Sequence, residues 1–196
     1  ELRPGMKLQT GRLDCSRIEV NPDGSFEILF APERPAGHTG NYICTNNTLT
    51  LSGTPSVNFS GTGLVSPAVL NFSSGTLFGT GTVTVNNVMN WTGGTMTGSG
   101  RTIIPVGATL NAAVPGAVSL NGRTLENGGT VLWTGAGFLA MNNGAIITNR
   151  AGALFEMQNA ISIIVQSGVS RFDNAGTFRK SANTGTTTFN VSFNNS

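Results

Sequence analysis

A short phrase that recurs along the chain limits its possible folds more than any other feature of the sequence. In its clearest form, at Val88–Met96, the phrase is a strand-like segment, a glycine turn and a second strand-like segment. Related phrases contain Val57, Leu70, Leu110, Leu125, Ile147, Phe172 and Phe193. Self-similarity at this spacing is typical of stacked repeats, because a single repeat cannot bury its own apolar face.

The aligned phrases predict two columns of side chains, since successive residues of a strand point to opposite sides. The outward column is polar and consists of Asn58, Asn71, Asn90, Asn111, Glu126, Thr148, Asp173 and Asn194. The inward column beside it consists of Phe59, Phe72, Trp91, Ala112, Asn127, Asn149, Asn174 and Asn195. In this alignment the inward column begins apolar and ends in four asparagines.

The four inward asparagines, Asn127, Asn149, Asn174 and Asn195, indicate that the repeats stack in register. A buried amide is costly unless it is hydrogen-bonded. In a stack of like residues, each amide can bond to the one on the coil above. We therefore expect an inward asparagine ladder in the second half of the chain.

The spacing of the inward positions fits the coils of a parallel β-solenoid. Most steps are 19, 21, 22, 25 and 21 residues, which suits one coil each. The steps to Phe72 and to Asn127 are only 13 and 15 residues, so there either the alignment is wrong or the coil is irregular. Stacked coils rise by about 4.8 Å, which gives about seven coils and a rod of roughly 34 Å. We predict an all-β chain, with a parallel β-solenoid (β-helix) at residues 46–196 and a small cap at residues 1–45.

Composition supports an all-β repeat chain and argues against some partners. The chain has 27 glycines and only 10% charged residues, against an average near ~25%. Its net charge is +2 without a basic cluster, so nucleic acid and acidic membranes are not expected partners. No apolar run approaches the ~20 residues that span a bilayer. Residues 46–100 carry no charge, but their recurring apolar positions argue against disorder.

Residues 1–45 differ from the repeats and are expected to form a β cap. They hold 11 of the 20 formally charged residues. The alternating segments Arg17–Val20 and Ser25–Phe30 flank the turn sequence Asn21-Pro22-Asp23-Gly24. Proline presets the turn and glycine takes its left-handed position, which predicts a β-hairpin.

Cys15 and Cys44 are the only cysteines, and they bracket the expected hairpin. A disulfide between them would tie the cap to the first coil and contribute about 3–4 kcal/mol on the chain-entropy model. The alternative is two free thiols in a reducing compartment. The extracellular character of the composition and the lack of a second pair of metal ligands favour the disulfide.

Three phrases carry a family resemblance: Asn149-x-x-Gly152-Ala153-Leu154, Asn174-x-Gly176-Thr177-Phe178 and Trp91-Thr92-Gly93-Gly94-Thr95-Met96. They resemble the repeats of secreted bacterial β-solenoid proteins, which include filamentous-haemagglutinin-like adhesins and autotransporter passengers. The resemblance covers roughly residues 46–196. It implies a solenoid fold and an extracellular or cell-surface setting, and it identifies no functional residue.

We expect no catalytic site, no metal site and no cofactor. His38 is the only histidine and reads as a solvent-facing loop residue. Many enzymes of this fold act on polysaccharides, and Glu126 and Asp173 fall in one outward column, roughly 10 Å apart. An ion pair with Arg171, two residues before Asp173, explains that carboxylate equally well. An enzyme is therefore the least expected class.

Two surface patterns leave alternatives open. Asparagines that fit the glycosylation pattern include Asn46, Asn58, Asn71, Asn90 and Asn190. For those in the outward column, a stacked asparagine ladder is the favoured explanation. Thr-x-Thr pairs could order water on an ice-binding face, but those at Thr48, Thr80, Thr95 and Thr186 do not recur at one column.

The last segment predicts an assembly edge. It contains Thr186, Thr188, Phe189, Val191 and Phe193, with no charge and no proline. An exposed strand of this kind is a template for another β element. The sequence stops within a repeat phrase, which suggests a larger parent or an end that pairs with another molecule. We expect an extracellular structural protein that assembles head to tail with itself into a fibre or surface stalk. The alternatives are an adhesin that binds surface glycans and an ice-binding module.

Overall fold

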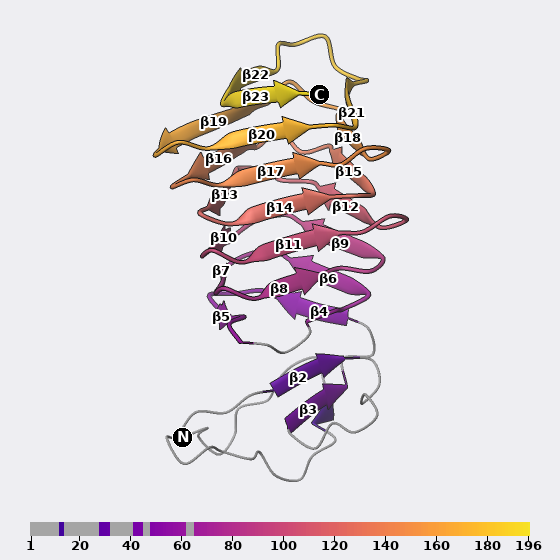
Figure 1. Cartoon of the computed structure of the whole chain (residues 1–196), viewed down its shortest axis with the longest axis vertical. Coiled ribbons are helices and arrows are strands. Elements are labelled where there is room, and N and C mark those ends of the chain that lie inside the picture. Colours follow the sequence, from indigo (N-terminus) through magenta and orange to yellow (C-terminus); the bar gives the residue numbers. More distant parts are fainter. Residues whose placement is uncertain (1–11, 14–27, 32–40, 45–47, 62–64) are drawn as a thin grey trace.

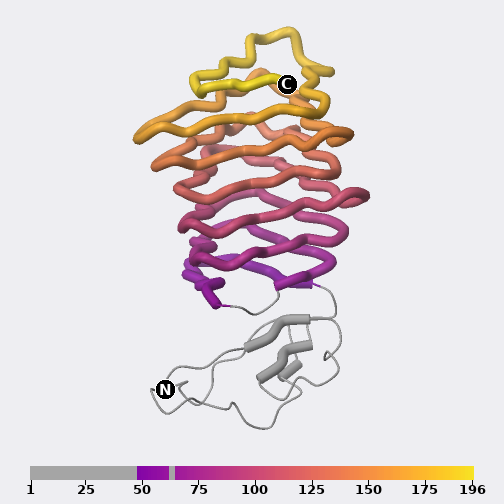
Figure 2. Tube along the Cα trace, viewed as in Figure 1, coloured from indigo at the N-terminus to yellow at the C-terminus, as the bar shows by residue number. Residues whose placement is uncertain are grey.

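The computed structural model describes residues 12–13, 28–31, 41–44, 48–61 and 65–196, and these residues form strands and turns without a helix. Residues 48–61 and 65–196 wind into stacked coils that rise from β4 to β23 (Figures 1 and 2). The predicted all-β parallel solenoid of about seven turns is thus confirmed. No segment among the described residues is a helix long and apolar enough to cross a membrane.

Three sheets form the three faces of the solenoid. Face 1 consists of β4 (Thr48–Leu51), β6 (Val69–Phe72), β9 (Val88–Trp91), β12 (Thr109–Ala112), β15 (Thr130–Trp133), β18 (Leu154–Met157) and β21 (Thr177–Lys180). Face 2 consists of β5 (Ser56–Asn58), β7 (Thr76–Phe78), β10 (Thr95–Thr97), β13 (Ala117–Asn121), β16 (Phe138–Asn142), β19 (Ser162–Ser167) and β22 (Thr188–Asn190). Face 3 consists of β8 (Thr82–Thr84), β11 (Arg101–Ile104), β14 (Thr124–Asn127), β17 (Ile146–Asn149), β20 (Arg171–Asn174) and β23 (Ser192–Asn195).

Alternation of apolar and polar residues explains why these short segments become strands. In β9, Met89 and Trp91 are fully buried, whereas Val88 and Asn90 between them are half-buried on the outer side. The strand pairs in parallel and in register with β6 below it and β12 above it. A period of two with one buried side is the pattern of a strand that covers a core.

Side chains of different size complement one another in the interior. On face 1, Ala112 lies between Trp91 on the coil below and Trp133 on the coil above. The two indole rings meet edge to face across this alanine, with their centroids 6.3 Å apart and an interplanar angle of 67°. Edge-to-face packing is a favoured arrangement of aromatic rings, so a small residue between two large ones produces a filled core.

The predicted columns combined residues from different faces, and this part of the alignment was wrong. Asn71, Asn90 and Asn111 lie on face 1, whereas Glu126, Thr148, Asp173 and Asn194 lie on face 3 and Asn58 lies on face 2. The short steps of 13 and 15 residues are the points where the alignment passed from one face to another. On face 1 the column of Trp91 continues to Trp133 and Met157, and on face 3 the column of Asn127 is preceded by Ile104. Strands on all three faces have the same apolar–polar–apolar pattern, so only the pairing of strands shows to which face a residue belongs.

Arg123 is a buried residue that the sequence did not reveal. It lies at the corner between β13 and β14, with no exposed surface. Its Nε donates to Thr102 Oγ1 at 2.9 Å, and its Nη2 donates to the carbonyl oxygens of Arg101 and Gly81 at 2.7 and 3.1 Å. Nη1 donates to Gly79 O at 3.3 Å. The guanidinium therefore ties three successive coils together from inside the corner.

A buried guanidinium without a carboxylate partner is costly to desolvate. Burial lowers the pKa of Arg123 to about 10, which still leaves the group charged at neutral pH. The carbonyl groups of the two lower corners compensate by accepting its N–H groups. Gly100 makes room for it, since a Cβ at this position would lie 2.7 Å from Arg123 Nη1. The glycine-rich corner and the arginine above it thus form one structural unit.

The N-terminal strands form a sheet separate from the three faces. β1 (Arg12–Leu13) pairs antiparallel with β3 (Asn41–Cys44), and β2 (Ile28–Ala31) pairs with β3 in parallel. The first strand and the turn of the expected hairpin lie outside the described residues, and β2 overlaps the second expected strand. Cys15, the side chain of Cys44 and His38 also lie outside them, so the disulfide stays a prediction.

Candidate functional site: the C-terminal end of the solenoid

The four expected ladder asparagines are brought together on face 3, each at the last position of its strand. Asn127 Nδ2 donates to Asn149 Oδ1 at 2.8 Å, and Asn149 Nδ2 donates to Asn174 Oδ1 at 2.7 Å. Asn174 Nδ2 donates to Asn195 Oδ1 at 2.7 Å. Each of the three lower amides also donates to a backbone carbonyl near the corner, such as Leu154 O at 2.9 Å from Asn127. Asn127 and Asn149 thus join their coil to the corner of the coil above, whereas Asn174 binds the corner of its own coil.

We expect Asn149→Leu to lower the free energy of unfolding by about 1–3 kcal/mol, because the buried amides of the neighbouring asparagines lose their partner. Asn71→Ser, in the half-buried outward position of β6, should cost less than about 0.5 kcal/mol. Denaturant unfolding of both variants measures the difference. Equal losses at the two positions would contradict the inward placement of Asn149.

The strands β21, β22 and β23 are the last strands of their faces and close the C-terminal end (Figure 1). Their edges differ in chemistry. β21 carries Arg179 and Lys180, and Lys180 Nζ donates to Gly185 O in the following loop. β22 and β23 carry no charge. A charged residue on an edge strand discourages pairing, so β22 and β23 form the more open part of this end.

Three phenylalanines, one from each face, cover the interior at this end. Phe178, Phe189 and Phe193 contact one another, with ring centroids 5.0, 5.7 and 5.4 Å apart. All three pack on Phe172 of the coil below, which is fully buried. Phe193 keeps 39% of its surface exposed. The end therefore presents an apolar aromatic surface rather than a polar cap.

The residues expected to form an assembly edge are found at this end. Thr188 and Phe189 lie on β22, Phe193 lies on β23, and Val191 joins the two strands. Thr186 lies in the loop before β22 instead of on a strand. Phe189 and Val191 pack partly against the core, and the outward side chain of Thr188 is exposed.

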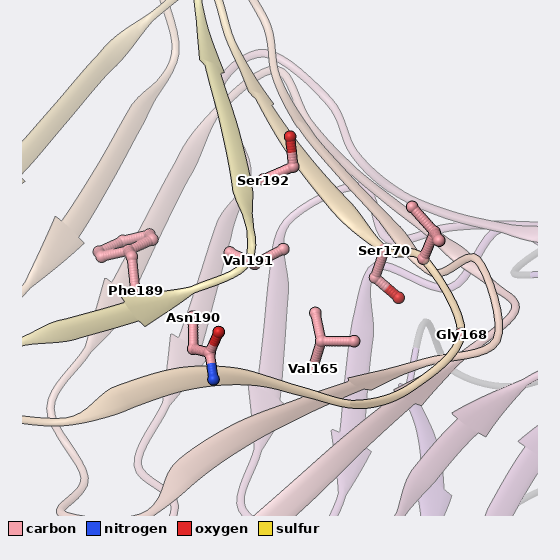
Figure 3. A pocket seen from close by; sticks show the side chains of 8 residues that line it. Val165, Gly168, Ser170, Phe189, Asn190, Val191 and Ser192 are labelled. Atoms are coloured by element: carbon pink, nitrogen blue, oxygen red, sulfur yellow. The ribbon is translucent and has the colours of Figure 1, made fainter.

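A pocket of about 350 Å³ lies beside this end, at the corner between faces 2 and 3 (Figure 3). The corner after β19 is wide, because the register between β16 and β19 shifts so that Asn142 pairs with Ser167. On the coil above, Val191 alone forms the corner between β22 and β23. The wall includes Val165, Ser170 and Val191. Ser170 Oγ is buried and has no hydrogen-bond partner among the described residues.

The two carboxylates considered for catalysis are held by arginines. Glu126 and Asp173 share one outward column with Thr148 between them, as predicted. Arg101 and Arg150 both pair with Glu126, and Arg101 Nη1 lies 3.4 Å from Glu126 Oε2. Arg171 pairs with Asp173 at 2.7 Å. Burial alone would raise the pKa of Asp173, but hydrogen bonds from Arg171 and Asn194 lower it overall. A general acid needs a raised pKa, so this geometry offers no support for one.

Glu156 on the outer side of β18 is the most strongly perturbed carboxylate described. Hydrogen bonds from Ser181, Arg179 and Gln158 lower its pKa to about 2 from a usual 4.5. These contacts join β18 to β21 and the loop that follows, so Glu156 anchors the last coil on face 1.

The stabilisation by Glu156 should depend on pH. A carboxylate with a lowered pKa in the folded state stabilises the protein above its unfolded pKa, and this contribution is lost as the pH falls. We expect the melting temperature of the wild type to exceed that of Glu156→Gln above pH 4.5, and the difference to shrink as the pH falls toward 2. Thermal unfolding followed by circular dichroism measures this. A difference independent of pH would contradict the assignment.

Outward polar residues form separate short arrays on the faces. On face 1, Asn90 Nδ2 donates to Asn71 Oδ1 at 2.8 Å, and Asn111 Nδ2 donates to Asn90 Oδ1 at 3.1 Å. These bonds agree with an outward ladder at Asn71 and Asn90. On face 2, Thr95 lies between Thr76 on the coil below and Ser119 on the coil above, and Thr97 neighbours Asn121. A regular threonine array is absent from this part of the described solenoid.

Comparisons with protein-family models, curated proteins and solved structures found no match. The class of the chain therefore rests on its own architecture. Parallel strands stacked in register on three faces, with no helix among the described residues, define a β-solenoid repeat protein.

Proposed function

We propose that this chain is a structural rod that is extended end to end at its C-terminal coil, as in a fibre or a cell-surface stalk. The solenoid fold supports a structural role, since stacking of coils produces a stiff element whose length grows with coil number. An extracellular setting, as in the secreted bacterial solenoid proteins that the repeats resemble, is part of the proposal.

The observation that carries the proposal is the chemistry of β22 and β23. These edge strands are uncharged, and they flank an aromatic surface on which Phe193 is 39% exposed. An edge strand offers unpaired N–H and C=O groups to another β element, and apolar neighbours add burial to that pairing.

A second copy is the first partner to test. The first strands of faces 1 and 2, β4 and β5, are edges of the same parallel sheets. A copy stacked head to tail would repeat the relation that already exists between successive coils. Such a contact joins two different surfaces and does not close on itself, so it would propagate into a filament.

We expect the full chain to associate in a concentration-dependent manner, and deletion of residues 186–196 to leave short soluble species. Phe193→Lys should weaken association, because a charge on an edge strand opposes pairing. Val106→Lys is the matched control, since Val106 is 88% exposed on a corner distant in sequence from β22 and β23. Sedimentation velocity measures association, and circular dichroism verifies that each variant is folded.

A wild-type chain that stays monomeric at high concentration would contradict self-assembly and favour a binding module. Equal association of Phe193→Lys and Val106→Lys would instead show that the chain associates elsewhere. A glycan-binding adhesin is then the next class to test, ahead of an ice-binding module, because the threonines of face 2 form no regular array.

A further inference from the structure

The asparagine ladder on face 3 has a direction. In every rung the Nδ2 group of the lower asparagine donates to the Oδ1 atom of the upper one, at 2.8, 2.7 and 2.7 Å. The ladder therefore has an acceptor end at Asn127 and a donor end at Asn195. These two ends have different requirements for what lies next to them.

The acceptor end is satisfied within its own coil. Asn127 Oδ1 accepts the backbone N–H of Gly129 at 3.1 Å, and the residue below it in the column is the apolar Ile104. The donor end differs. Asn195 Oδ1 accepts from Asn174, but no acceptor among the described residues receives the N–H groups of Asn195. A β element placed on β23 would bury this amide, so it must supply acceptors.

We propose that the C-terminal end recognises a β-solenoid coil of another molecule that carries asparagine at the ladder register, followed by a glycine corner. This inference rests on the proposed function, namely that a β element is added to β22 and β23. The rungs within the chain define the required chemistry, since an upper asparagine supplies Oδ1 and the corner near it supplies a carbonyl oxygen.

The first coil of a second copy meets this requirement only in part. Val65 bridges Val83 in parallel, which places Pro67 at the ladder register of the first coil. Proline offers no side-chain acceptor. One N–H of Asn195 would remain without a partner in a head-to-tail junction. A junction between two copies of this chain is therefore weaker than a junction with a coil that carries asparagine at this position.

Peptides that represent the two kinds of coil test the inference on the full chain. One peptide copies residues 162–178, which contain Asn174, the glycine corner after it and the carbonyl group of Thr177. A second carries Asn174→Leu, and a third of the same length copies residues 56–72, which contain Pro67. Each peptide carries a fluorophore, and anisotropy measures its binding to the full chain.

The peptide with asparagine should bind about five- to tenfold more tightly than the other two, as expected for one hydrogen bond and one avoided orphan donor. The preference should vanish with Asn195→Leu in the protein and persist with Asn194→Ala, whose side chain points outward to Asp173.

Equal binding of the three peptides, tighter binding of the Pro67 peptide, or no binding at all would overturn the inference. Equal binding leaves the proposed extension at β22 and β23 intact. Failure of the full chain to associate, together with selective peptide binding, would instead reject self-assembly and leave the recognition of an asparagine coil in place.

Discussion

The substitution Arg123→Ala is expected to lower the free energy of unfolding by about 3–5 kcal/mol. It removes a fully buried side chain and leaves a cavity inside the corner of the solenoid. It also removes the donors for Thr102 Oγ1 and for the carbonyl oxygen of Arg101. The carbonyl groups of Gly79 and Gly81 still accept backbone N–H groups, so the loss of their hydrogen bonds to Arg123 costs less.

Denaturant unfolding of Arg123→Ala, Arg123→Lys and Arg101→Ala tests this expectation. Lysine has a compact ammonium that cannot reproduce the forked contacts of the guanidinium, so Arg123→Lys should recover only part of the loss. Arg101 has a side chain that is 54% exposed, and its loss should cost less than about 1 kcal/mol. A small loss at Arg123, similar to that at Arg101, would mean that the guanidinium does not hold the coils together.

The substitution Gly137→Ala should cost about 3 kcal/mol, because its methyl group has no space. A Cβ at this position would lie 1.6 Å from the carbonyl oxygen of Gly116 on the coil below. The obstacle is backbone, so it moves only if the two coils separate. The hydrogen bond from Gly137 N to Val114 O, 2.8 Å long, would then be strained or lost.

Gly116 provides the matched control on the facing coil. A Cβ on Gly116 would meet nothing within 4 Å, so Gly116→Ala should change stability by less than about 0.5 kcal/mol. Thermal unfolding of the two alanine variants compares them directly. Similar melting temperatures would contradict the close approach of these two corners.

The sequence predicted the fold class and the asparagine ladder because both depend on local patterns. Asn149 and Asn174 each precede a glycine by two or three residues, and the two phrases occupy the same position of successive coils on face 3. The assignment of residues to faces could not be predicted in the same way. Strands on all three faces alternate alike, and only inter-strand pairing distinguishes Asn111 on face 1 from Glu126 on face 3.

The role of Arg123 could not be read from its own segment. A charged residue next to Gly122 at a corner resembles an ordinary surface turn. The informative signal lies one and two coils earlier, where Gly100 leaves space for the guanidinium and Gly79 and Gly81 supply carbonyl oxygens at the same corner. That relation can be recognised only when the register of strand pairing is known. The partners of Arg123 on the lowest of the three coils, Gly79 and Gly81, are more than 40 residues away in the sequence.

Negative-stain electron microscopy of the purified chain over a range of concentrations tests the central claim most directly. End-to-end extension at β22 and β23 predicts unbranched rods at high concentration that lengthen with concentration, and far fewer of them with Phe193→Lys than with Val106→Lys. Single short particles at every concentration, or rods equally abundant in the two variants, would contradict extension of this chain at its C-terminal coil.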